Sequence, residues 1–162
     1  MFCGGFMTRP RRERGRETGH PGVEGTIVIL DLDKFGEVVA ERGWSEYEPN
    51  PATGLLTNLV ERFARKWQAV VIYGLDEERG TEEAVLEIPY VEPEEVREDL
   101  EAIRREVNRL GVGVTIVAVK GIVTGQPAMD RREAYYGTPF RRYARSLLEK
   151  LKRRGGNAVF IG

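Results

Sequence analysis

Two aspartates at the end of an apolar run are the residues of this sequence best suited to chemistry. Asp31 and Asp33 follow residues 26–30, a continuous run of β-branched and aliphatic side chains. Such a run is typical of a central strand that is covered on both faces. Carboxylate oxygens are ligands that Mg²⁺ prefers, usually together with the phosphates of a bound nucleotide. The alternative is structural, because acidic residues also end strands and begin turns.

A second acidic segment follows another apolar run. Asp76 and Glu77 come after residues 70–72 and precede a further strand-like segment, which predicts that they lie in the loop of a hairpin. If the two apolar runs are neighbouring strands, these acids converge with Asp31 and Asp33. We therefore expect a magnesium site made from these carboxylates.

Composition limits the function classes. The chain has 162 residues, enough for one well-filled domain, and its net charge of −1 gives no overall field that attracts nucleic acid. The only cysteine is Cys3 and the only histidine is His20, so an internal disulfide, a zinc hydrolase site and a Ser-His-Asp triad are not expected. No apolar run approaches the roughly 20 residues that cross a bilayer, and we expect a cytoplasmic protein. The many arginines and glutamates fit a heat-adapted protein, although GC-rich codon use has the same effect.

The amino-terminal segment differs from the rest of the chain. Residues 1–24 are rich in glycine and arginine and have no periodic apolar face, which predicts a disordered basic tail. Residues 25–162 then form the single domain. A basic arm can bind nucleic acid, but glutamates dilute the charge here, so nucleic acid is not the expected partner.

Apolar periodicity predicts the order β-α-β-β-α-β-α-β. Strands are expected over residues 26–30, 69–73, 84–88, 114–119 and 158–161, and helices over residues 55–67, 93–110 and 139–151. This order indicates an α+β fold of the ferredoxin-like or palm type, an antiparallel sheet with two right-handed crossovers and helices mainly on one face. In that fold the first and third strands lie near each other at the centre, which would bring the two acidic segments together.

Three segments, in order, resemble the palm domain of the nucleotidyl cyclases, especially the GGDEF diguanylate cyclases. Residues 30–35, Leu-Asp-Leu-Asp-Lys-Phe, resemble the Asp-x-Asp-x-Phe strand end of that family, and residues 73–78, Tyr-Gly-Leu-Asp-Glu-Glu, resemble its hairpin motif. The terminal signature of the family is matched in spacing by Ala144, Leu148, Lys152, Gly155 and Asn157.

The resemblance implies roles for these residues. Asp31 and either Asp76 or Glu77 would hold Mg²⁺, with Asp33 as a second ligand or a base. Lys152 would pair with phosphates, although an exposed lysine at a helix end also compensates the helix dipole. The implied nucleotide-binding residues are Leu32, Lys34, Phe35, Gly74 and Asn157. The family also implies a homodimer or higher oligomer.

The sequence departs from the cyclase pattern at three places. Leu75 replaces a glycine that lets the nucleotide approach the hairpin, Arg145 stands where the family has aspartate, and no Asn-Asp pair follows Phe35. A second resemblance is to archaeal GTP cyclohydrolase III, through the tripeptides Pro-Asn-Pro at 49–51 and Thr-Pro-Phe at 138–140. That enzyme contains two palm units in one chain, so an equivalent assembly here would be a homodimer.

Three functions follow from these patterns. The preferred one is a Mg²⁺-dependent enzyme acting on a purine nucleoside triphosphate, with GTP favoured, by hydrolysis of the cyclohydrolase III kind or related nucleotidyl chemistry. The alternative, motivated by Leu75 and Arg145, is a degenerate palm domain that binds a nucleotide without turnover. The third is a ferredoxin-like nucleic-acid binder, although the strands offer few aromatic side chains on which bases stack.

Overall fold

The structure is a computed structural model, and it describes residues 22–45 and 47–162. Most of the predicted amino-terminal tail lies outside the described residues. The first described strand begins at Val23, two residues before the predicted domain boundary at residue 25. No helix in the described part of the chain has the length and apolar character that crossing a bilayer requires.

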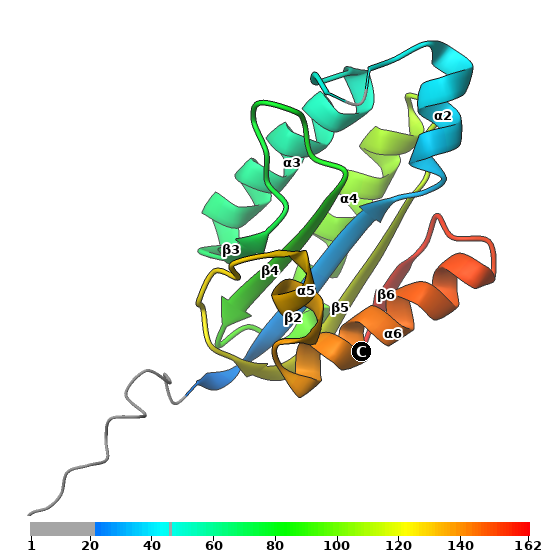
Figure 1. Ribbon diagram of the computed structural model, residues 1–162. Helices are drawn as coiled ribbons and strands as arrows, with labels where there is room; N and C mark the ends of the chain where they lie inside the picture. The colour runs from blue at the N-terminus through cyan, green and yellow to red at the C-terminus, as the bar shows by residue number, and fades with distance from the viewer. Residues whose placement is uncertain (1–21, 46) are drawn as a thin grey trace, which may run out of the picture.

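Five strands form one mixed sheet in the order β3-β4-β2-β5-β6 (Figure 1). They are β2 (Val23–Leu32), β3 (Val70–Tyr73), β4 (Glu83–Pro89), β5 (Val114–Val123) and β6 (Val159–Ile161). Neighbouring strands are antiparallel, except that β6 runs parallel to β5. The predicted α+β fold is confirmed, and β2 and β4, the first and third strands, are neighbours as expected.

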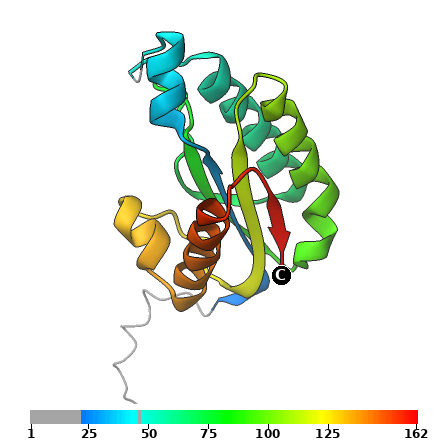
Figure 2. The same ribbon diagram turned by 90° about the vertical axis from the view of Figure 1, so that its right-hand side faces the viewer.

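Helices cover both faces of this sheet (Figure 2). They are α2 (Phe35–Arg42), α3 (Pro51–Trp67), α4 (Arg97–Asn108) with a preceding 3-10 turn η2 (Pro93–Val96), α5 (Arg131–Tyr136) and α6 (Pro139–Arg153). The two crossover helices, α3 and α4, share one face with α2, as predicted for the crossovers. The short helices α2 and α5 were not predicted, and α5 and α6 form a second layer on the opposite face.

Side chains alternate in direction along β2, and they pack into two separate layers of the core. Val28 and Leu30 point toward the layer of α3 and α4, while Ile27 and Ile29 point toward the layer of α5 and α6. All four side chains are fully buried. A continuous apolar run is therefore required here, because residues on both faces of this strand are removed from water.

The two tripeptides that resemble GTP cyclohydrolase III are helix starts. The Asn50 side chain accepts hydrogen bonds from the amides of Ala52 (3.0 Å) and Thr53 (2.9 Å) and caps α3. Thr138 accepts from the amide of Arg141 (3.1 Å) and caps α6. In both, proline occupies the first turn, where its missing amide hydrogen costs nothing. Helix capping therefore explains both tripeptides.

Candidate functional site

The carboxyl end of β2 positions the two aspartates. Asp31 still pairs with the neighbouring strands, opposite Glu83 of β4 and Thr115 of β5. Its side chain lies on the α6 face of the sheet, because it shares the parity of Ile29. After Leu32 the chain turns sharply into α2 through a left-handed residue at position 34, with φ of 48°.

Lys152 connects both aspartates from the last turn of α6. Its Nζ lies 2.8 Å from Oδ1 of Asp33 and 3.5 Å from Oδ2 of Asp31. The same nitrogen also donates to the backbone carbonyl of Leu32, at 3.2 Å. The structure thus brings together three of the residues that the sequence singled out for chemistry, over a separation of about 120 positions.

Asp33 also accepts hydrogen bonds from β5 and from the segment after α6. The Thr115 hydroxyl donates to Oδ1 at 2.6 Å, and the Asn157 amide donates to Oδ2 at 2.6 Å. This approach depends on Gly156, which has φ of 68° and whose added Cβ would lie 2.8 Å from Oδ2 of Asp33. The predicted residue Asn157 therefore belongs to this cluster through its backbone.

Glu83 is a site residue that sequence reasoning missed. Its carboxylate accepts two hydrogen bonds from Arg131 of α5, at 2.7 and 3.1 Å, and one from the hydroxyl of Tyr135, at 2.6 Å. Arg145, which replaces the aspartate of the cyclase pattern, lies 4.2 Å above the Tyr135 ring. No periodicity predicts so short a helix as α5, and only the pairing of β4 with β2 places Glu83 opposite Asp31.

Burial sets the protonation chemistry of this cluster. The pKa of Asp31 is raised from 3.8 to about 6, chiefly because the side chain is removed from water; Lys152 opposes the rise, and the neighbouring Glu83 carboxylate adds to it. Burial, followed by the Glu83 carboxylate, likewise raises the pKa of Tyr135. Tyr135 therefore stays a hydrogen-bond donor at neutral pH.

The acids of the hairpin interact within their own loop and with α3. Asp76 turns back into its own loop, where its Oδ1 accepts from the amides of Glu78 and Arg79, both at 2.9 Å. Glu77 is exposed, and a hydrogen bond with Glu61 of α3 raises its pKa. Within residues 22–45 and 47–162, no three acidic, histidine or cysteine side chains are grouped to hold a metal ion. The expected convergence of four carboxylates is therefore not formed, because a turn within the loop holds Asp76.

The oxygen atoms at the end of β2 have the chemistry of a Mg²⁺ site but not the arrangement of one. Two carboxylates and the carbonyl of Leu32 are hard donors suited to Mg²⁺. They are directed instead at the ammonium group of Lys152. The residues as arranged here do not fit a divalent cation.

A small hollow beside this cluster adjoins Lys34, the N-cap residue of α2. The N-cap residue, Lys34, makes no side-chain cap hydrogen bond, and an added Cβ on Gly36 would meet no atom within 4 Å. The hollow has a volume of about 80 Å³ and is lined by Asp33, Lys34, Lys152, Gly155 and Gly156. A helix start facing open space beside two lysines is suited to an anionic group.

The predicted residue Gly74 lies at the other side of Asp31, where β3 ends. Its φ is 105°, and an added Cβ would lie 2.0 Å from the carbonyl oxygen of Glu83. It lines a second hollow of about 150 Å³ together with Asp76 and Glu83. Leu75, the next residue, packs against the α3 and α4 core. The glycine is thus required by the close approach of β4.

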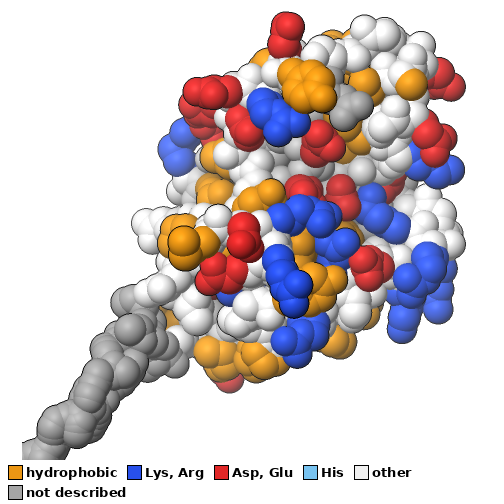
Figure 3. All heavy atoms as spheres, viewed as in Figure 1, with side chains coloured by type: hydrophobic (Ala, Val, Ile, Leu, Met, Phe, Trp, Pro, Cys, Tyr) orange, Lys and Arg blue, Asp and Glu red, His pale blue; other side chains and the backbone are white. Residues whose placement is uncertain are grey.

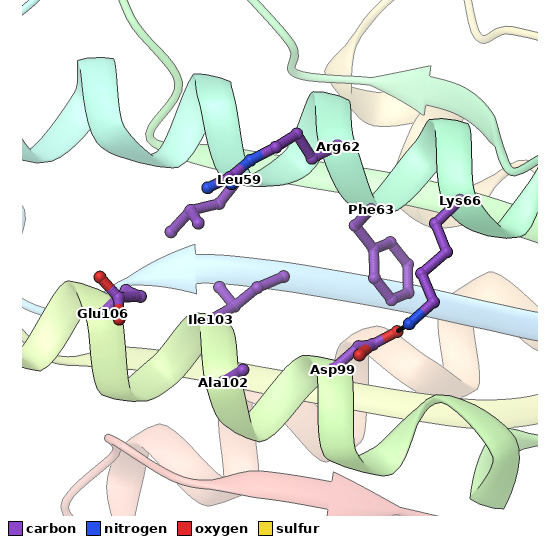
Figure 4. Close-up of a pocket in the computed structure, with 8 residues that line it drawn as sticks. All are labelled: Leu59, Arg62, Phe63, Lys66, Asp99, Ala102, Ile103 and Glu106. Atoms are coloured by element: carbon purple, nitrogen blue, oxygen red, sulfur yellow. Dashed lines mark ion pairs between the residues drawn. The ribbon is translucent and has the colours of Figure 1, made fainter.

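A larger groove lies between α3 and α4, on the opposite face of the sheet (Figure 4). Phe63 and Ile103 lie in it, and an ion pair of 2.8 Å joins Lys66 to Asp99 across one end. Its volume is about 470 Å³. None of the residues singled out in the sequence for chemistry lines it, and the Lys152 cluster stays the candidate site.

The architecture is similar to that of several solved structures. The chain matches a microbial GGDEF domain solved with cyclic di-GMP, at 16% identity and a TM-score of 0.50, over 86% of this chain and 78% of that one. The chain has the fold of the GGDEF domains. It also matches the GGDEF domain of FimX from Pseudomonas aeruginosa, at 13% identity and a TM-score of 0.53, over 90% of this chain and 85% of that one.

A third match is the diguanylate cyclase SiaD from Pseudomonas aeruginosa, solved with its activator SiaC, at 19% identity and a TM-score of 0.53. The match covers 93% of this chain but 55% of SiaD. No protein-family model and no curated protein sequence matches the chain. The GGDEF-type fold predicted from three short segments is confirmed, whereas the relation to GTP cyclohydrolase III, the oligomeric state, the compartment and heat adaptation stay predictions.

Proposed function

We propose that this chain is a palm domain that binds a purine nucleoside triphosphate, with GTP favoured, at the turn between β2 and α2. The observation that carries the proposal is the hollow lined by Lys34, which is the N-cap residue of α2, and by Lys152. Backbone amides at a helix start and two ammonium groups are the donors that phosphates require. In the GGDEF-type fold this turn follows the central strand.

Nearby cations offset the carboxylates of this site. Asp31 and Asp33 alone would repel phosphates, but Lys152 lies against both. Lysine and arginine side chains also gather over α5 and α6 on the face shown in Figure 3. Positive charge on this face favours the approach of a polyanion, most strongly at low ionic strength.

The geometry supports binding better than turnover. The enzyme hypothesis required hairpin acids beside Asp31, but Asp76 is held in its own turn. The third oxygen-rich group near Asp31 is Glu83, whose carboxylate is already bound by Arg131 and Tyr135. The degenerate palm domain, the alternative left open by the sequence, is therefore the function proposed.

The nucleic-acid hypothesis requires an open face of the sheet, which the described residues do not provide. A ferredoxin-like module of that kind binds single strands on an open face of its sheet. Here one face is packed against α3 and α4 and the other against α5 and α6. A nucleotide at the end of β2 does not need an open sheet face.

The test is calorimetric titration of the full chain with GTP, ATP and CTP, followed by mass spectrometry of the nucleotide after long incubation. We expect GTP to bind, ATP to bind more weakly, and the nucleotides to be recovered unchanged with or without Mg²⁺. Lys34→Ala should weaken GTP binding by about tenfold, since it removes one phosphate contact. Lys150→Ala, an exposed lysine of α6, is the matched control. A folded chain that binds no nucleotide would contradict the proposal. A new product in the mass spectrum would support the enzyme hypothesis instead.

A further inference from the structure

The ammonium group of Lys152 occupies the position that a cation would take at the end of β2. Three oxygens from consecutive residues, Asp31, Leu32 and Asp33, are directed at one nitrogen, at 3.5, 3.2 and 2.8 Å. Two of these oxygens are carboxylate and one is a backbone carbonyl. The set combines the oxygen types that ligate hard divalent cations in proteins.

The fold places Lys152 there and holds it. Ala144 and Leu148, two turns and one turn before it, are buried in the layer between α6 and the sheet. The helix ends at Arg153, and Gly155 and Gly156, both with positive φ, then turn the chain back toward Asp33. The lysine side chain is about one quarter exposed. Its position is therefore set by packing on one side and by a tight turn on the other.

The carboxylates of Asp33 and Glu83 also accept hydrogen bonds from other groups. Oδ1 of Asp33 accepts from Thr115 as well as from Lys152, and Oδ2 accepts from the Asn157 amide. Glu83, the acid opposite Asp31, is bound by two groups of α5. A divalent ion held by the same three oxygens would have to displace the ammonium group.

We propose that Lys152 is a built-in substitute for the divalent cation at the end of β2, so that this site does not bind a metal ion. The charges support the substitution. Asp31, Asp33 and Lys152 together carry one net negative charge, and loss of the ammonium group would leave two negative charges beside each other. That change would create a site for a hard divalent cation. The inference concerns the protein and the metal alone, and it does not depend on nucleotide binding.

The test measures Mn²⁺ binding to the full chain without nucleotide, from the electron paramagnetic resonance signal of the free ion. We expect no Mn²⁺ site at the end of β2 in the wild type or in the control Lys150→Ala. Lys152→Met keeps the apolar stem and removes the charge, and it should gain one Mn²⁺ site, tighter than any wild-type binding by about tenfold or more. The double variant Lys152→Met with Asp33→Asn should lose that site.

Two results would overturn the proposal. One is a wild-type Mn²⁺ site as tight as that of Lys152→Met, and the other is a folded Lys152→Met chain that gains no site. If circular dichroism shows that Lys152→Met is unfolded, the wild-type protein is used to test the proposal. Selective broadening of the Asp33 and Asn157 amide signals by Mn²⁺ in a nuclear magnetic resonance spectrum then refutes the proposal, and unchanged signals support it.

Discussion

At the scale of single residues, the end of β2 keeps charged groups in a poorly hydrated place. Asp31 is buried deeply enough that its pKa rises to about 6, although Lys152 lies 3.5 Å away. The Coulombic attraction is thus smaller than the cost of removing the carboxylate from water. A site of this kind is less stable than a neutral one would be, and such a cost is typical of functional positions.

The raised pKa of Asp31 gives stability a definite pH dependence. Between pH 3.8 and about 6 the folded chain binds more protons at Asp31 than the unfolded chain does, so this residue lowers the free energy of unfolding as pH rises. Asp31→Asn removes the penalty. We expect it to stabilise the chain by about 1 to 3 kcal/mol above about pH 7 and to have little effect near about pH 4.

Urea unfolding at both pH values measures this effect. The exposed Glu41 of α2 provides the control, and Glu41→Gln should change stability little at either pH. Equal effects of Asp31→Asn at the two pH values would show that burial does not govern this carboxylate.

A second buried charge, away from the site, has a structural role. Glu87 of β4 is fully buried, and its Oε1 accepts from the amides of Thr124 (2.9 Å) and Gly125 (2.8 Å). Arg141 of α6, itself buried, approaches the other oxygen at 3.8 Å. The pair fixes the loop after β5 to the start of α6.

Removal of one member of this pair should be costly. Arg141→Met leaves the Glu87 carboxylate buried without a counter-charge, and we expect a loss of about 3 to 5 kcal/mol in the free energy of unfolding. Adding Glu87→Gln should recover part of that loss, because the amide oxygen still accepts the two backbone hydrogen bonds. Denaturant unfolding of both single variants and the double variant gives the coupling energy. A double variant less stable than Arg141→Met would contradict this account.

At the scale of elements, helix starts in this chain depend on local side chains. The Asn50 side chain accepts hydrogen bonds from two amides of α3, and the Thr53 hydroxyl oxygen in turn accepts one from the Asn50 amide, at 3.0 Å. This reciprocal cap fixes the start of the longest helix in the described residues, which carries much of the core on its face.

Loss of the α3 cap should be measurable by thermal unfolding. Asn50→Ala leaves the amides of Ala52 and Thr53 without their acceptor and should cost about 1 kcal/mol, whereas Asn50→Ser should retain most of the stability. Asn58→Ala, on the exposed side of the same helix, is the control. Equal stability of the alanine and serine variants would show that the cap contributes little.

The turn after α6 links that helix to the site. Gly156→Ala forces a side chain into a left-handed position and places a Cβ within 2.8 Å of the Asp33 carboxylate. We expect the Asp33 contacts to Asn157 and Lys152 to be displaced and GTP binding to weaken by about tenfold or more, with a smaller loss of stability. Calorimetric titration beside thermal unfolding separates the two effects. Unchanged binding in a folded variant would exclude this turn from the nucleotide site.

At the scale of the whole molecule, the sheet joins two apolar layers, and the candidate site lies where both end. β2 contributes to both layers, carries Asp31 near its end, and is followed directly by Asp33 and α2. A ligand that contacts this end therefore binds the folded chain and not the unfolded one, and its binding energy adds to global stability.

Thermal unfolding with nucleotide tests that link. GTP at about 100 times its Kd should stabilise the chain by about 2.7 kcal/mol, in one cooperative transition. Lys34→Ala should show a smaller shift at the same GTP concentration, while Lys150→Ala should show the wild-type shift. A shift that is the same in all three chains would place the nucleotide elsewhere.

The sequence by itself determined the order of the long elements and the identity of the strand that carries the aspartates. Continuous β-branched residues at 26–30 and helical spacing at 55–67 depend on neighbours along the chain, so periodicity is sufficient to predict them. Spacings shared with the GGDEF family also singled out Lys152 and Asn157 as site residues, and in the structure both contact Asp33.

Tertiary structure decided what those residues contact. The sequence predicted that Asp76 and Glu77 meet Asp31, but a turn within the hairpin loop directs Asp76 elsewhere. The sequence did not predict Glu83 as a site residue, because only the register of β4 against β2 places Glu83 opposite Asp31. The direction of a loop side chain and the pairing of strands across a sheet depend on contacts between residues that are distant in sequence. The contacts of the Lys152 ammonium group with Asp31 and Asp33 are of this kind.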